Sequence, residues 1–260
     1  KASGGVGLKE TSTGDFTMSV TGRPVRAYLY WAGRYPSNSG GDDQIQIAIN
    51  GGTPIVIKAD KSRESDLGNG TTYYTYQSAN LVNDVRFAGL LSGAFTVTAW
   101  GLRSANLPTD EGYGIGLIVI GEDASCPFGQ LDLLYGLDSF DEQLGTVMAS
   151  AAQQSQDEFG PNSEVLCVQF DPVATARTLD FQAFIGGAEG VNAIWSLTGT
   201  GILPTELIAN GTGTVLDGPP VTAVSPFIAN VGQQLDNYTN RLIIPANTTY
   251  ACFQLESAPP

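Results

Sequence analysis

Histidine is absent from this 260-residue chain, and cysteine and basic residues are scarce. Without histidine, no Ser-His or Cys-His pair can activate a nucleophile, and no SxxK motif offers a lysine in its place. The three cysteines, Cys126, Cys167 and Cys252, are too far apart for a CxxC metal-binding or redox motif. They allow either one disulfide with a free thiol or three buried thiols. A zinc site is disfavoured, because it needs four such ligands, or three and a water.

Positive charge is also scarce, with 12 Lys and Arg against 26 Asp and Glu and a net charge of −14. Binding to nucleic acid needs clustered basic residues, so this charge balance excludes nucleic-acid partners. The longest apolar run, residues 115–120, is too short to span a membrane. The chain starts at Lys1 and shows no signal peptide, as expected of a processed secreted protein or of a trimmed chain.

What the chain has in abundance is the composition of short strands and tight turns, with 32 Gly and 14 Pro. Residues 44–49 and 55–57 alternate around an Asn-Gly-Gly turn and predict a hairpin. Two apolar runs, 115–120 and 131–137, are expected to be adjacent core strands. We therefore expect an all-β fold, a jelly-roll-like β-sandwich with short helical or irregular insertions. The insertions would be a short helix in 79–91 and a helix or loop in 146–156.

The N-terminal residues are predicted to behave differently from the rest. Phe16, Met18 and Val20 alternate with polar residues and fall on one face of a strand. We assign residues 1–24 to an N-terminal extension and strand, and residues 25–260 to a single sandwich domain. The strand would insert either into its own subunit or into a neighbouring one.

Four stretches carry a resemblance to a known family: AYLYWAGR at 27–34, DVRFAG to FTVTAW at 84–100, GYGIGLIVIGEDAS at 112–125 and LDLLYGLDSF at 131–140. Together they resemble a secreted β-sandwich domain found at the front of bacterial and archaeal cell-surface proteins. The resemblance implies an extracellular location at the cell surface and no enzymatic activity. Because no tandem repeats or anchor follow here, it implies a repeating subunit or a fragment of a larger protein.

Clustered carboxylates are the candidates for metal binding. Asp42 with Asp43, and Glu122 with Asp123, lie in turn-like sequence and could supply oxygen ligands to Ca²⁺. The alternative is that they are solvated carboxylates at strand ends. A hydrolase using two carboxylates, with Glu122, Asp123 and Asp138 as suspects, is the third and least favoured hypothesis. We expect no enzyme and no obligatory cofactor.

Surface modification and sugar binding have their own candidates. Four N-x-[ST] sequons, at Asn69, Asn210, Asn237 and Asn247, are candidate glycosylation sites. Tyrosines could stack on sugars, although tyrosines on strands more often cover a half-buried sheet. The tyrosines concerned are Tyr28, Tyr30, Tyr73, Tyr74 and Tyr76.

The favoured function is a structural one. We expect an extracellular subunit of a filament, pilus or surface assembly, a homo-polymer in which a strand carrying Phe16, Met18 and Val20 is added to a neighbour's sheet. The alternative is a cell-surface adhesin that binds a glycan or a host or cell-surface ligand, with calcium dependence. Filaments or a discrete monomer, seen under negative stain, would separate the two.

Overall fold

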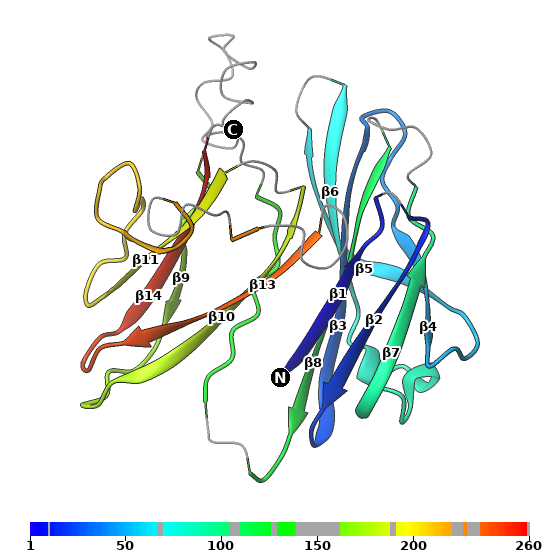
Figure 1. The fold of residues 1–260 in the computed structure, drawn as a ribbon, viewed down its shortest axis with the longest axis horizontal. Coiled ribbons are helices and arrows are strands. Elements are labelled where there is room, and N and C mark those ends of the chain that lie inside the picture. Colours follow the sequence, from blue (N-terminus) through cyan, green and yellow to red (C-terminus); the bar gives the residue numbers. More distant parts are fainter. Residues whose placement is uncertain are drawn as a thin grey trace.

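The computed structural model describes residues 1–9, 11–66, 70–103, 110–125, 129–138, 162–187, 191–219, 226–227 and 235–258. These residues form strands joined by turns, with two short 3-10 turns and no α-helix, which confirms the all-β class (Figure 1). The strands are β1 (Ala2–Gly7), β2 (Thr13–Val20), β3 (Arg23–Pro36), β4 (Gln44–Ile49), β5 (Ile55–Asp66), β6 (Thr71–Ser78), β7 (Gly93–Trp100), β8 (Glu111–Glu122), β9 (Leu166–Gln169), β10 (Arg177–Gly186), β11 (Val191–Gly199), β12 (Thr214–Asp217), β13 (Leu235–Ile244) and β14 (Tyr250–Ala258).

The first eight strands form one antiparallel sheet that curls until it is nearly closed into a barrel. The strand order is β1-β8-β3-β6-β5-β4-β7-β2, so the two edges are the first two strands of the chain. The edges meet through side chains, with Val6 of β1 against Gly14 of β2. The eight strands occupy the right half of Figure 1.

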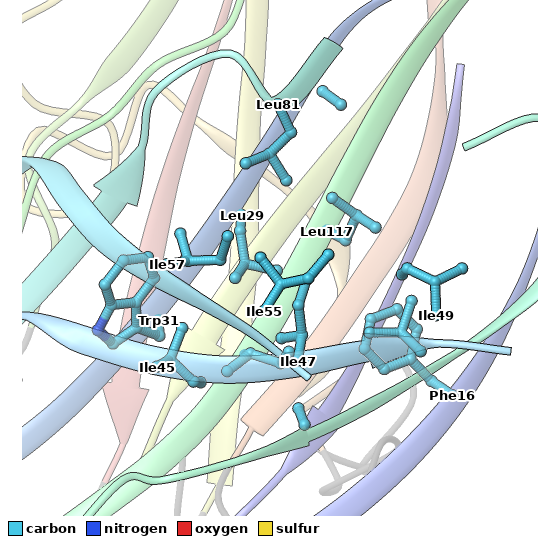
Figure 2. Packing of buried hydrophobic residues seen from close by; sticks show 14 of the residues in the cluster. Phe16, Leu29, Trp31, Ile45, Ile47, Ile49, Ile55, Ile57, Leu81 and Leu117 are labelled. Carbon is cyan, nitrogen blue, oxygen red and sulfur yellow. The ribbon is translucent and has the colours of Figure 1, made fainter. Parts of the chain in front are cut away.

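The barrel is held by a single apolar core. Strand alternation sends every second side chain inward, so Leu29 and Trp31 of β3 lie in the same core as Leu117 of β8 (Figure 2). Leu29 and Leu117 are completely buried, and Trp31 is 2% exposed. The predicted hairpin, β4 and β5, contributes its isoleucines to the same core.

Two smaller sheets form a second unit from residues 162–258, to the left in Figure 1. One has the order β12-β11-β14-β9 and the other is the ribbon β10-β13. They pack face to face, with the rings of Phe181 in β10 and Phe253 in β14 stacked at 4.3 Å. A disulfide joins Cys167 to Cys252, which are directly opposite on β9 and β14. The sequence had left this pairing open, and Cys126 lies outside the described residues.

The second apolar run of the sequence, 131–137, is not a strand, and the expectation of a core strand there was wrong. The segment runs between the two units (Figure 1), and Leu131 and Leu134 are 43% and 60% exposed. Tyr135 ties it to the outside of the barrel, because its hydroxyl donates to the Thr75 carbonyl at 2.8 Å. An apolar run therefore serves here as a connection between units.

The predicted short helix in 79–91 takes the form of two 3-10 turns, Leu81–Asn83 and Val85–Phe87. The side chains of Asn80 and Asp84 cap them by accepting hydrogen bonds from backbone amides. The helix or loop predicted for 146–156 lies outside the described residues.

Candidate assembly site

The N-terminal segment, residues 1–20, supplies both edges of the barrel sheet. β1 pairs antiparallel with β8, from Ala2 opposite Val119 to Gly7 opposite Gly114. β2 pairs antiparallel with β7 through all eight of its residues. The segment thus fills the gap between β8 and β7, two strands that would otherwise end the sheet with unpaired backbone groups.

The three residues predicted for the assembly strand all point into the barrel. Phe16 is 9% exposed, and Met18 and Val20 are each 5% exposed. Leu8, which the alternation pattern did not single out, is buried beside them at 1%. Gly4 of β1 lies so close that an added Cβ would be 2.9 Å from the Met18 side chain. In this structure the segment completes the core of its own chain.

A two-residue turn, Thr21 and Gly22, joins the segment to β3. Gly22 has φ +76°, and a Cβ at this position would collide with the Glu122 carbonyl oxygen. Glycine is therefore required for the tight turn. The turn is flanked by an exposed ion pair, with Arg23 Nη2 2.5 Å from Glu122 Oε2.

The connection between β1 and β2 is tied to the barrel by a buried carboxylate. The side chain of Glu111, at the start of β8, is 5% exposed. It pairs with Arg34 at 2.9 Å and with Lys9 at 3.4 Å. Beside it, burial raises the pKa of Tyr113, and the neighbouring Tyr73 acts in the same direction. The sequence carries one signal of this site, which is an acidic residue at the start of an otherwise apolar strand.

The first pair of candidate metal ligands is occupied by protein groups. Asp42 accepts hydrogen bonds from the Tyr35 hydroxyl at 3.1 Å and from the backbone and side chain of Arg103 at 2.6 and 2.8 Å. Asp43 forms an exposed ion pair with Lys58 at 3.6 Å. Burial, and then Asp42, raise the pKa of Tyr35. Asp42 thus holds Arg103 at the end of the barrel through hydrogen bonds and an ion pair.

The second pair, Glu122 and Asp123, lies at the other end of β8. Arg103, which binds Asp42, accepts a hydrogen bond from the Gly112 amide at the start of β8. About ten residues of β8 separate Gly112 from Glu122. That length is about 30 Å, so the two pairs form no joint site. Asp123 accepts hydrogen bonds from the hydroxyl and amide of Ser125, which lower its pKa. Within the described ranges, no group of three His, Cys, Asp or Glu residues could hold a metal ion.

The sequons differ in accessibility. Asn210 and Asn247 lie in exposed turns, the latter with φ +61°. Asn237 lies on β13, where its side-chain oxygen accepts a hydrogen bond from Gln182 at 2.7 Å. Asn69 is outside the described residues. Glycosylation stays a prediction, with Asn237 the least accessible of the three.

The five tyrosines do not form one platform, because strand alternation divides them between two faces. Tyr74 and Tyr76 point into the barrel, where their rings stack at 6.1 Å. Tyr28, Tyr30 and Tyr73 have the opposite parity on β3 and β6 and lie on the outside, half-buried.

No family model and no curated protein matches this chain. The resemblance to secreted surface domains therefore stays a prediction. Across the described residues, no helix is long and apolar enough to cross a membrane.

Proposed function

We propose that the protein is an extracellular structural subunit of a filament, pilus or surface assembly. In this proposal, segment 1–20 of one copy fills the gap between β7 and β8 of the next. The observation that carries it is that one N-terminal segment supplies both edges of a sheet that is otherwise continuous. Its withdrawal leaves two facing backbone edges and an open apolar core, the kind of slot that an added strand fills.

Exchange loses few contacts, because the segment forms the same strand pairings in a neighbouring chain as in its own chain. Short, strained hinges favour such exchange over closure within one chain. The Thr21–Gly22 turn is a short hinge, because only two residues separate β2 from β3. A head-to-tail exchange does not close on itself and so builds fibres.

The supporting observations for an extracellular location are independent of the strands. A disulfide between Cys167 and Cys252 indicates an oxidising environment. The net charge of −14 favours solubility and disfavours binding to anionic surfaces. Within the all-β class, we propose kinship with the jelly-roll-like sandwich domains of bacterial and archaeal cell-surface proteins.

A disulfide reporter tests the exchange directly. Thr17 and Thr96 face each other on β2 and β7, and Thr96 directs its backbone groups to Asn50 on the other side. The pair is therefore not hydrogen-bonded across β2 and β7, so its side chains approach closely. We expect Thr17→Cys with Thr96→Cys, made with Cys126→Ala, to give a ladder of covalent multimers on a non-reducing gel after oxidation of assembled material.

The control is each single cysteine variant, which should give no ladder. Negative-stain electron microscopy of the same sample should show filaments. A double-cysteine chain that oxidises quantitatively within monomers, at a concentration where wild-type particles are seen, would contradict strand exchange.

A second candidate, a glycan-binding adhesin, is favoured by one feature. A cleft of about 1970 Å³ separates the barrel from the second unit and is lined by aromatic rings, including Tyr30, Tyr73, Tyr135 and Phe184. Stacking rings in a groove suit a sugar chain. Binding on a glycan array that Tyr135→Ala abolishes, without filaments, would favour this candidate, and chelator would test the calcium dependence.

A further inference from the structure

The groove that holds β1 has two walls from different units. One wall is the backbone edge of β8, which pairs with β1. The other is the ribbon β10-β13, which lies against the outer face of β1 and β8. A backbone edge accepts almost any sequence, because it offers only main-chain hydrogen bonds. Selectivity for one strand must come from side chains on the second wall.

The second wall fits a strand that has no large side chains on its outward face. An added Cβ on Gly5 would lie 2.7 Å from the Ile115 carbonyl oxygen and 3.5 Å from a methyl group of Leu235 on β13. Beneath the ribbon, a Cβ on Gly116 would lie 2.5 Å from the ring of Phe184 on β10. Glycines on β1 and β8 thus let the ribbon approach closely.

The wall also makes polar contacts with β1. The Gln182 side-chain amide donates to the Ser3 hydroxyl and, at 2.7 Å, to Asn237 on β13. Arg241 lowers the pKa of Asp180 through a hydrogen bond, and Lys1 acts in the same direction. The ribbon therefore contacts β1 near its start, where Gln182 meets Ser3.

We propose that the ribbon β10-β13 is the selectivity element of assembly, a lid that accepts β1 of a second copy through its outward residues Ser3 and Gly5. This inference rests on the proposed strand exchange. β1 fits the lid, whereas β2 does not, because its outward side chains are larger and include Asp15. The lid thereby fixes which of the two N-terminal strands pairs with β8 and in which register.

The test uses the full chain with the Thr17→Cys, Thr96→Cys and Cys126→Ala reporter. On the acceptor side, Leu235→Ala and Gln182→Ala each remove one contact with β1. On the donor side, Gly5→Val crowds the groove, and we expect it to lower the yield of interchain cross-link by roughly tenfold. Ile243→Ala is the matched control, because Ile243 lies on β13 but is 68% exposed.

A compensating pair guards against variants that simply fold poorly. Ser3→Asp should lower the interchain yield, and Gln182→Arg in the same chain should restore it, because the new charges meet where the two side chains now touch. Reduced yield with restoration supports the lid. Interchain cross-links that none of these variants changes overturn the lid but leave strand exchange standing. Cross-links confined to single chains overturn both.

Discussion

The barrel and the second unit are stabilised in different ways. The barrel buries one continuous cluster, in which Leu29, Leu117 and Val119 are wholly inaccessible. The second unit divides its apolar residues among three small clusters and adds a disulfide. Small cores supply little net stability and commonly need a covalent link. The barrel is thus held by packing, whereas the second unit relies on a cross-link and on contact with the barrel.

The largest expected effect comes from the barrel core. Leu117→Ala should lower the free energy of unfolding by about 4 kcal/mol, because it leaves a cavity at a completely buried position. Chemical denaturation followed by tryptophan fluorescence measures this. Val85→Ala, at a side chain 86% exposed, is the control and should change it by less than about 0.5 kcal/mol. Equal effects at the two sites would mean that the barrel is not a single packed core.

The buried carboxylate should come next. Glu111→Gln removes the buried carboxylate that pairs with both Arg34 and Lys9, and should cost about 3 kcal/mol. Because Lys9 lies between β1 and β2, amide exchange should rise first in those two strands. Arg86→Ala, which breaks an exposed ion pair, serves as control. Unchanged protection of β1 and β2 in Glu111→Gln would show that the carboxylate does not tie down the N-terminal segment.

Removing the disulfide tests the second unit. Cys167→Ala with Cys252→Ala should cost about 2 to 3 kcal/mol, a typical loss for a disulfide, because the unfolded chain regains freedom that the cross-link had removed. The loss should be local, with faster amide exchange in β9 and β14 and little change in β3 and β8. Amide exchange that rises equally in both units would show that they unfold together and do not differ in how they are stabilised.

The smallest effect should come from the contact between the units. Gly116→Ala places a methyl group against the Phe184 ring and should cost about 1 to 2 kcal/mol. Adding Phe184→Ala should relieve the clash, so a double-mutant cycle should show a coupling energy of opposite sign to the single effect. Additive costs would place Phe184 away from Gly116 in solution.

Local pattern predicted much of the fold and of the candidate site. Alternation at Phe16, Met18 and Val20 was enough to predict a strand and its inward face. The partner of that strand was not predictable, because β7 lies some eighty residues later and pairing depends on the whole sheet. The prediction of a core strand at 131–137 was wrong for a related reason. An apolar run does not by itself show whether a sheet will cover it. Which cysteines pair is likewise decided by register, here between β9 and β14.

The closing of the barrel by its first two strands also has a consequence in time. Ala2 is synthesised well before its partner Val119, which appears only after most of the barrel has been made. Pairings between distant parts of a chain form slowly, because a large loop must be closed first. We therefore expect the N-terminal segment to be the last part of the barrel to pair. In the proposed exchange, the gap between β7 and β8 of a neighbouring chain would compete during that interval with the same gap in its own chain.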